Sequence, residues 1–373
     1  MAQRCLLPAV MIAVAAACGT DVQRGTTADP GAIARGARVD LTGAGATFPY
    51  PLYSRWFNEY AQQTNVQINY QSIGSGGGIR QVLARTVDFG ATDVPMLDAE
   101  LAQTRLQIIH VPTVLGAVAI TYNLPQLQRP LRLTGDLIAD IFLGRITRWN
   151  DRRIAEFNAD AHLPDRDILV VHRTDGSGTS YIMSDYLTAV SPAWAGGPGR
   201  GKDVRWPTGI GGKGNEGVAG QVKQLVGSIG YLEVVYARQN RLPIAHIRNR
   251  AGHFMSPMPF EIASAAASST ATAKDSLDVR ASLVDATGEH AYPIASFTFM
   301  LLAPQAIGPE KTRQLVAFLH WALTEGGDVA SALGYVALPT ETATRVLDRL
   351  DVALAHLAPS APTRRSNPSA SRP

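Results

Sequence analysis

A short glycine- and hydroxyl-rich stretch near the middle of the chain has the residue types that bind anions. Residues 173–180 read Arg-Thr-Asp-Gly-Ser-Gly-Thr-Ser and follow the apolar run at 168–171. The residues after them have the apolar spacing of a helix. A buried strand, a turn of small residues and a helix together direct backbone N–H groups toward a bound anion. Arg173 adds a positive charge just before the turn, so the stretch predicts an anion-binding site.

Two earlier turns repeat this order of strand, small residues and helix. Residues 42–51 contain two glycines, two prolines and Thr47, which is placed to cap a helix that runs to about Gln63. Residues 73–78 read Ile-Gly-Ser-Gly-Gly-Gly, with Ser75 in the turn. They are not a dinucleotide-binding fingerprint, because Ile79 takes the place of the third glycine. One such turn is common, but three in one chain indicate a compact polyanion held by neutral donors.

Asp93 and the segment 211–215 give weaker signals. Asp93 ends a short apolar strand before a proline-containing turn, where an aspartate caps a helix more often than it binds a ligand. Residues 211–215 read Gly-Gly-Lys-Gly-Asn and resemble a phosphate loop. They fail the Walker pattern, because Gly214 follows the lysine where Ser or Thr is required. We interpret this segment as a turn that leads into a helix capped near Asn215.

The residues of a catalytic centre are not evident in the sequence. The eight histidines are scattered without the H-E-x-x-H spacing, and no G-x-S-x-G motif occurs. Ser75 and Ser177 have no base near them in sequence and are more simply helix caps. The two cysteines, Cys5 and Cys18, lie near the N-terminus, so the rest of the chain has no thiol nucleophile or disulfide. We expect a binding protein without a cofactor or metal, and not an enzyme.

The ends of the chain have the character of export and linker segments. Residues 1–17 are predicted to be a signal peptide, with Arg4 before an apolar run that is too short for a typical membrane-spanning helix. The run ends in Ala-Ala-Ala-Cys, which looks like a bacterial lipoprotein cleavage site and would make Cys18 the lipid-bearing first residue. Ordinary signal-peptidase cleavage is the alternative. Residues 18–38 are expected to form a tether and 359–373 a disordered tail.

Chain length, net charge and the spacing of apolar residues indicate the domain number and fold class of the folded part. A chain of 373 residues is expected to form two domains, and a net charge of +3 gives no support for a nucleic-acid partner. Nearly continuous apolar runs at 111–122 and 292–301 predict buried strands, the first leading out of the first domain. Besides the helices that follow residues 180 and 215, the predicted helices after residue 130 are at 136–143, 151–157, 263–273, 312–323 and 341–357. Because strands and helices alternate, the sequence indicates the α/β class.

Six stretches resemble those of one known family. They are LTGAGATFPYPLY (41–53), NYQSIGSGGGIRQVLARTVDFGATDVPM (69–96), FLGRITRWND (142–151), HRTDGSGTS (172–180), WPTGIGGKGNEGVAG (206–220) and YPIASFTFML (292–301). From about residue 40 to 355 the chain thus resembles the phosphate-binding proteins of bacterial high-affinity phosphate ABC importers. The resemblance implies a two-lobed periplasmic-binding-protein fold of type II with two crossing hinge segments. Lobe I would comprise 39–120 and 293–358, and lobe II would comprise 121–292.

The resemblance also implies a function and the residues that perform it. The protein would be exported to the periplasm or cell surface, would be held there by a lipid anchor in a membrane, and would act as a monomer. It would deliver inorganic phosphate to the membrane permease of the importer. The phosphate ligands carried over are Thr47, Phe48, Ser75, Asp93, Arg173, Ser177, Gly178 and Thr179, with Asp175 orienting the arginine. Gly76 departs from the family, in which a second serine is common; it removes a hydroxyl but keeps the N–H, so the site should survive.

Asp93 would give this ligand set its selectivity. Phosphate carries at least one proton near neutral pH and can donate it to Asp93, whereas sulfate carries none and would face an unpaired charge, a mismatch that can reject a ligand by a factor on the order of 10⁴. A small ligand gains at most about −1.5 kcal/mol of binding free energy per heavy atom, which gives about −8 kcal/mol for phosphate. This free energy corresponds to micromolar or somewhat tighter affinity. An exported phosphatase, a binder of another tetrahedral oxyanion such as sulfate, and a phosphate sensor or sequestering protein are the alternatives.

Overall fold

A nine-stranded sheet is the main framework of residues 38–270 and 282–357, which the computed structural model describes. Its order is β2-β1-β3-β11-β4-β8-β6-β7, and β12 also pairs with β4. The strands are β1 (Val39–Gly45), β2 (Val66–Ser72), β3 (Phe89–Thr92), β4 (Ile109–Tyr122), β6 (Leu169–Arg173), β7 (Ile210–Gly212), β8 (Ser228–Glu233), β11 (Ala295–Leu302) and β12 (Val336–Ala337). A smaller sheet, β10-β9-β5, contains β5 (Arg132–Leu133), β9 (His246–Arg248) and β10 (Phe254–Met255). The predicted signal peptide, Cys18, the tether before Arg38 and the C-terminal tail lie outside the described residues.

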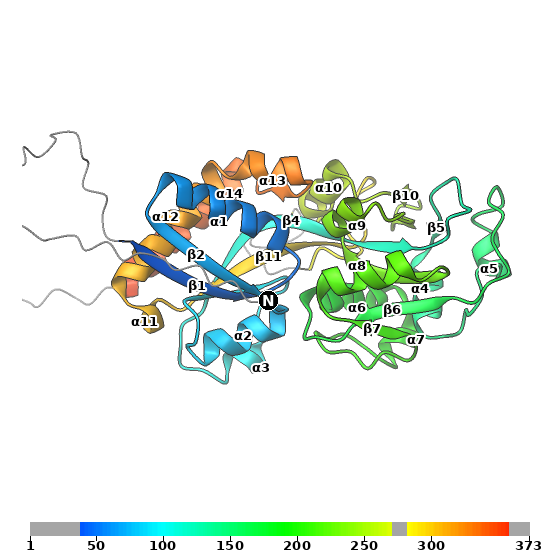
Figure 1. Cartoon of the computed structure of the whole chain (residues 1–373), viewed down its shortest axis with the longest axis horizontal. Coiled ribbons are helices and arrows are strands. Elements are labelled where there is room, and N and C mark those ends of the chain that lie inside the picture. The colour runs from blue at the N-terminus through cyan, green and yellow to red at the C-terminus, as the bar shows by residue number, and fades with distance from the viewer. Residues whose placement is uncertain (1–37, 271–281, 358–373) are drawn as a thin grey trace, which may run out of the picture. The chain divides into compact units, whose positions relative to one another are not determined.

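Strand β4 belongs to both halves of the large sheet (Figure 1). It pairs antiparallel with β11 over residues 109–117 and with β8 over residues 118–122. The strand is buried from Val111 to Tyr122, as expected for a strand covered on both faces, and the strand predicted there is confirmed. The Val118 N–H donates to the Ile294 carbonyl at 2.8 Å, so the segment that enters β11 lies beside β4 where β4 changes partners.

Parallel strands alternate with helices in both halves of the sheet. β1 is parallel to β2 and β3, and β6 is parallel to β7 and β8, which confirms the predicted α/β class. The helices are α1 (Tyr50–Gln63), α2 (Ser75–Leu83), α3 (Asp98–Leu101), α4 (Gly135–Phe142), α5 (Arg152–Ala155), α6 (Gly178–Val190), α7 (Pro192–Ala195), α8 (Gly214–Gln224), α9 (Val234–Asn240), α10 (Pro259–Thr270), α11 (Pro304–Ile307), α12 (Pro309–Thr324), α13 (Gly327–Leu333) and α14 (Thr340–Leu357). Residues from Arg38 onward form one compact unit, within which the lobe boundaries remain a prediction.

Most predicted helices occur with somewhat different ends. α4, α12 and α14 lie within a few residues of the ranges expected from their apolar spacing. α5 is shorter than the predicted 151–157, because the Asn158 side-chain amide donates to the Ile154 carbonyl at 2.8 Å and ends the helix there. α10 begins at Pro259 and not at 263, and the predicted end of that helix lies outside the described residues.

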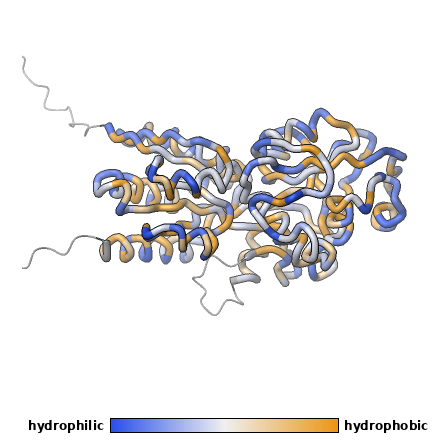
Figure 2. Tube along the Cα trace, turned by 90° about the horizontal axis from the view of Figure 1, so that it is seen from below, coloured by the Kyte–Doolittle hydropathy of each residue, from blue (hydrophilic) through white to orange (hydrophobic). Residues whose placement is uncertain are grey.

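Aromatic side chains form much of the core in each half of the sheet. Phe318 of α12 lies 5.3 Å from both Phe57 and Tyr60 of α1, measured between ring centroids. In the other half, Trp206 stacks on Tyr231 of β8 at 5.2 Å. Figure 2 shows hydrophobic and hydrophilic residues intermixed along the helices, as expected for helices with one buried face. In the part of the chain that the structure covers, no helix is both long and apolar enough to cross a membrane.

Close packing of α2 on the sheet depends on Gly78. A Cβ at this position would lie 2.5 Å from the Gly45 Cα and 2.6 Å from the Ala44 carbonyl oxygen, both in the β1 backbone. Neither backbone atom can move without shifting β1, so only glycine permits this distance between helix and sheet. The contact sets the position of the first turn of α2, which begins at Ser75.

We predict that Gly78→Ala destabilises the fold by about 1–3 kcal/mol, because the added methyl must push α2 away from β1. Gly220→Ala is the matched control. Gly220 also lies inside a helix, but nothing stands within 4 Å of the position of its Cβ, so alanine there should stabilise α8 by up to about 1 kcal/mol. Urea unfolding of both variants measures the difference. Equal stabilities would show that α2 packs less tightly than described.

Candidate functional site

The predicted anion ligands lie together beyond the carboxyl ends of the parallel strands. Thr47 follows β1, Ser75 follows β2 and Asp93 follows β3, while Arg173 ends β6 and is followed by the turn at 174–177. This edge is where open α/β sheets bind ligands. All members of the predicted set are buried, Asp93 at 1 % and Arg173 at 4 % exposure. The structure therefore brings together residues that are up to 132 positions apart in sequence, from Thr47 to Thr179.

Asp93 is held by hydroxyl groups and does not pair directly with a cation. The Thr298 hydroxyl donates to Asp93 Oδ1 at 3.0 Å, and the Ser75 hydroxyl donates to Oδ2 at 3.3 Å. Burial raises the pKa of Asp93 to about 7, although the Thr298 hydrogen bond and the charge of Arg173 oppose this shift. The carboxyl group can thus carry or release a proton near neutral pH. It does not cap a helix, since α3 begins at Asp98.

The Arg173 guanidinium is paired with Asp175, the partner that the family resemblance implies for it. Arg173 Nε donates to Asp175 Oδ1 at 2.7 Å, and Nη2 donates to Oδ2. The Gly214 N–H also donates to Asp175 Oδ1, at 3.0 Å. Burial alone would raise the pKa of Asp175, but the paired guanidinium outweighs it and holds the pKa below its ordinary value. The remaining nitrogen, Nη1, reaches the Thr179 hydroxyl at 3.2 Å.

Residues 177–179 open helix α6. Ser177 is the N-cap, because its hydroxyl accepts from the Ser180 N–H at 3.0 Å. Its own N–H donates to the Lys202 carbonyl at 2.9 Å. Gly178 and Thr179 form the first helical turn, whose N–H groups have no partner within the helix. The sequence-based expectation of a helix cap at Ser177 is confirmed.

Hydrogen bonds join this turn to the first turn of α2. The Gly178 N–H donates to the Ser75 hydroxyl at 3.2 Å, and the Gly76 N–H donates to the Gly176 carbonyl at 2.8 Å. A Cβ on Gly178 would lie 2.5 Å from both Asp93 Oδ2 and Ser75 Oγ, so only glycine allows this approach. Ser75 is not the cap of α2, because Gly74 holds that position. The Gly76 N–H, expected to remain available to the site, is used to hold the two turns together.

Thr47 and Phe48 lie in the site, but Thr47 is not a helix cap, as the sequence analysis had expected. Pro49 holds the cap position of α1, two residues later, and the Thr47 hydroxyl is turned toward α8. The Tyr236 hydroxyl donates to the Thr47 carbonyl at 2.7 Å. Phe48 is fully buried, and its carbonyl accepts from the Tyr335 hydroxyl at 2.7 Å. The Thr47–Phe48 turn is therefore fixed from two sides.

Asn215 is a site residue that sequence reasoning assigned only to a helix start. α8 begins at Gly214 after Lys213, so Asn215 does not cap it. Its fully buried side chain donates from Nδ2 to the Thr47 hydroxyl at 2.7 Å and to the Thr179 hydroxyl at 3.3 Å. The only signal in the sequence was an asparagine one residue after the glycine turn, and that pattern is common at helix starts.

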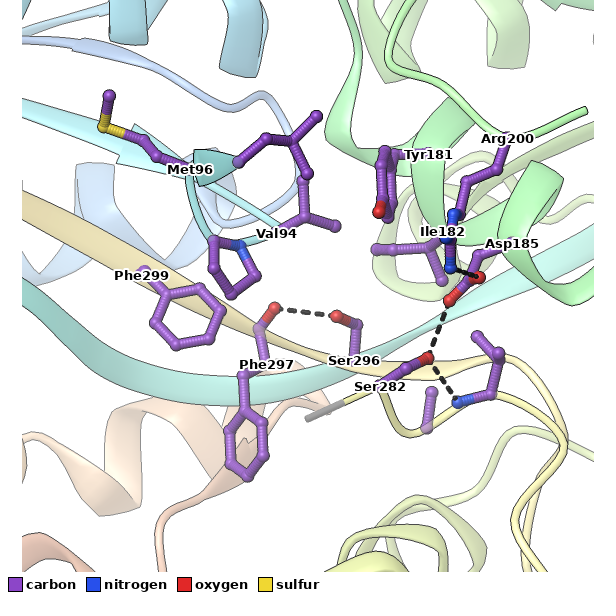
Figure 3. A pocket seen from close by; sticks show the side chains of 14 residues that line it. Val94, Met96, Tyr181, Ile182, Asp185, Arg200, Ser282, Ser296, Phe297 and Phe299 are labelled. Atoms are coloured by element: carbon purple, nitrogen blue, oxygen red, sulfur yellow. Dashed lines mark hydrogen bonds and ion pairs between the residues drawn. The ribbon is translucent and has the colours of Figure 1, made fainter. Parts of the chain in front are cut away.

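A separate cavity of about 270 Å³ opens next to these turns (Figure 3). Its lining begins at Val94, directly after Asp93, and includes Tyr181 and Asp185 of α6. Asp185 is already paired, since Arg200 Nη1 donates to it at 2.9 Å and the Ser282 hydroxyl at 2.7 Å. The cavity thus presents a carboxylate and an arginine that are already paired with each other, together with aromatic rings, and this lining does not suit an anion. The anion donors lie in the turns beside it.

The donors of the site are a guanidinium, hydroxyls, an amide and backbone N–H groups. No cluster of three or more His, Cys, Asp or Glu side chains with metal-binding geometry occurs among residues 38–270 and 282–357. One arginine with many neutral donors and one hydroxyl-bound carboxyl suits an oxyanion that brings its own proton.

Comparison with known proteins places the chain in a family. A family model described as a PBP superfamily domain matches residues 25–325. The phosphate-binding protein PstS of Pasteurella multocida is 45 % identical over 82 % of this chain and 88 % of its own length. The PstS protein of Haemophilus influenzae is 43 % identical over 82 % and 91 %. A solved high-affinity periplasmic phosphate-binding protein with bound phosphate has the same fold, with a TM-score of 0.66 at 22 % identity over 83 % of this chain and 93 % of that one. The chain therefore has the periplasmic-binding-protein fold and belongs to the PstS family of phosphate-binding proteins.

Proposed function

We propose that this protein captures inorganic phosphate and delivers it to the membrane permease of a phosphate ABC importer. Its PstS relatives are named for phosphate binding. The observation that carries the proposal is the buried Asp93 carboxyl, held only by hydroxyls, within a ring of donors that includes Arg173. This arrangement fits an anion that also carries a proton. As further parts of the proposal, the protein binds its ligand without converting it and acts as a monomer.

The phosphate would lie among the eight residues of the predicted set. Arg173 Nη1 and the N–H groups of Gly178 and Thr179 would donate from one side, and Thr47, Phe48 and Ser75 from the other. In the structure the Gly178 N–H donates to the Ser75 hydroxyl, so a phosphate oxygen would replace that hydroxyl as the acceptor. Ser177 would contribute through its hydroxyl, which already caps α6.

The two groups of donors would belong to two lobes that close on the ion. We assign 39–120 and 293–358 to lobe I, and 121–292 to lobe II. The change of partners along β4 supports this division, because β4 leaves β11 for β8 at residues 117–118. The hydrogen bond between Val118 and Ile294 would then join the two crossing segments at the hinge.

The pKa of Asp93 explains how phosphate and sulfate would be distinguished. Phosphate can donate its own proton to an ionised Asp93. Sulfate has no proton and can bind only when Asp93 itself is protonated. A carboxyl with a pKa of about 7 loses its proton as the pH rises through 7, so sulfate binding should weaken as the pH rises.

We predict that wild-type protein binds phosphate with micromolar or tighter affinity and that Asp93→Asn narrows the difference between phosphate and sulfate. The asparagine carries no charge to repel sulfate and can donate to it. Wild-type sulfate affinity should rise about tenfold between pH 8 and pH 6, following the protonated fraction of Asp93, whereas the variant should show no such change. Isothermal titration, with sulfate measured by displacement, tests both. Absence of phosphate binding to wild-type protein would overturn the proposed function, and unchanged sulfate exclusion by the variant would overturn the role of Asp93.

An ion pair between the proposed lobes offers a test of closure. Lys202 Nζ lies 2.7 Å from the Glu100 carboxylate, and both side chains are largely buried. The Lys202 carbonyl also holds the Ser177 N–H, so the same residue links the α6 turn to lobe I. We predict that Lys202→Met weakens phosphate binding about fivefold, mainly through faster dissociation, because a partly buried pair contributes about 1 kcal/mol. Stopped-flow dissociation of phosphate measures the rate.

Lys311→Met is the control for the Lys202 variant. Lys311 Nζ lies 2.8 Å from Asp88, and both residues fall within lobe I. Breaking this pair should lower stability without changing the phosphate dissociation rate. If both variants change the rate equally, the Lys202–Glu100 pair does not act through closure.

We also propose that the mature chain is exported and carries a lipid on Cys18. This residue lies outside the described part of the chain, and the proposal rests on the Ala-Ala-Ala-Cys sequence before and at the predicted cleavage site. Mass spectrometry of protein from a bacterial host should give a chain that begins at Cys18 with the added mass of a diacylglyceryl group. A mature chain without this added mass would contradict the lipid on Cys18 and would indicate a soluble exported protein.

A further inference from the structure

The side chain of Asn215 forms three hydrogen bonds at the boundary between the two groups of donors. Nδ2 donates to the hydroxyls of Thr47 and Thr179, and Oδ1 accepts from the Glu233 N–H at 2.9 Å. Thr47 follows β1 and Thr179 opens α6, so the amide lies between the donors of the two proposed lobes. A side-chain amide has two N–H donors and a carbonyl acceptor, and each of these has a partner here.

The orientation of this amide is determined by its neighbours. The Glu233 group that faces Asn215 is a backbone N–H, which can only donate, so the atom opposite it must be the amide oxygen. The amide nitrogen consequently faces the two threonines. If the amide rotated by 180°, its NH₂ group would face the Glu233 N–H, and a buried donor would lose its partner. Asn215 therefore acts as a donor toward both hydroxyls.

Both threonine hydroxyls are occupied as acceptors. Thr47 Oγ1 accepts from Asn215 Nδ2 and from the Asn215 backbone N–H at 3.3 Å. Thr179 Oγ1 accepts from Asn215 Nδ2 and from Arg173 Nη1. A hydroxyl has two lone pairs and one proton, so each of these hydroxyls can form one further hydrogen bond only by donating.

We infer that Asn215 is a positioning residue for anion binding, which orients the Thr47 and Thr179 hydroxyls so that they donate to the ligand. The inference rests on the proposed function. Neither hydroxyl can then accept the proton of a hydrogen phosphate ion. Asp93 is then the carboxylate acceptor for that proton, and its selectivity thus depends in part on a residue that does not itself need to touch the ion.

The first test removes the amide at nearly constant size. Asn215→Leu should weaken phosphate binding roughly 10- to 100-fold, because two oriented donors are lost. In a protein that also carries Thr47→Val and Thr179→Val there are no hydroxyls to orient, and the same substitution should weaken binding by less than about threefold. Isothermal titration of phosphate into the four proteins of this cycle measures the coupling. An equal effect in both backgrounds would overturn the inference.

Asn158→Leu is a matched control for a merely structural role. Asn158 is also buried, donates from Nδ2 to two carbonyls at 2.8 Å and accepts from the Arg132 N–H at 2.8 Å, but it lies at the end of α5. Its replacement should lower the unfolding temperature and leave the phosphate affinity within about twofold, since no site hydroxyl depends on it. If Asn158→Leu weakens phosphate binding as much as Asn215→Leu does, the inference is overturned.

Asn215→Asp covers the case in which the leucine variant does not fold. The carboxylate keeps an oxygen for the Glu233 N–H, but it accepts where the amide donated and so turns the threonine protons toward itself. Phosphate binding should then weaken by at least about 100-fold, because the two donors are lost and a negative charge is added. Wild-type affinity in this variant would overturn the inference. Failure of wild-type protein to bind phosphate would instead overturn the proposed function.

Discussion

A buried carboxyl group inside the proposed anion site is the constraint on which the rest of the structure depends. Such a group is costly unless its charge is removed or shared, and burial accordingly raises the pKa of Asp93 to about 7. Arg173 could neutralise Asp93 directly, but its guanidinium is paired with Asp175 instead. Asp93 thereby stays ready to share a proton with a ligand. If Asp93 and Arg173 were paired, both groups would already be satisfied and selectivity for a protonated anion would be lost.

The sheet brings the Asp93 carboxyl and the Arg173 guanidinium close together, although they come from different strands. β1, β2 and β3 supply the hydroxyls and Asp93, while β6 and β7 lead to the Arg173 turn and to Asn215. Strand β4 pairs with strands of both halves of the sheet and so joins them. The two groups of residues are therefore held on one framework, although they come from different parts of the sheet. Glycine at 178 then allows the turns to approach to hydrogen-bonding distance. The candidate site is thus formed only where these two sets of turns meet.

Local sequence could predict the parts of this site but not every contact between them. The helices after residues 74 and 177, the cap at Ser177 and the strand at 111–122 followed from residue types and apolar spacing. The helix caps expected at Ser75 and Thr47 were wrong: Gly74 and Pro49 hold those positions, and only the distant Asn215 turns the Thr47 hydroxyl away. Asn215 itself could not be recognised as a site residue from the sequence, for the same reason. Its partners are 168 and 36 residues away, and no local pattern encodes such contacts.

The contacts between the turns also bear on how strongly such a site can bind. Ser75 with Gly178 and Gly76 with Gly176 form hydrogen bonds across the candidate site, and in the proposed function an entering ion would exchange the first of these for its own. The net gain for each donor is then the difference between two hydrogen bonds, which is much smaller than the energy of either. A site with many donors can therefore bind firmly and still release its ligand. In the proposed function, selectivity would not be reduced in this way, because the donors that Asp93 has in the protein are the neutral hydroxyls of Ser75 and Thr298, whereas the P–OH group of phosphate is more acidic.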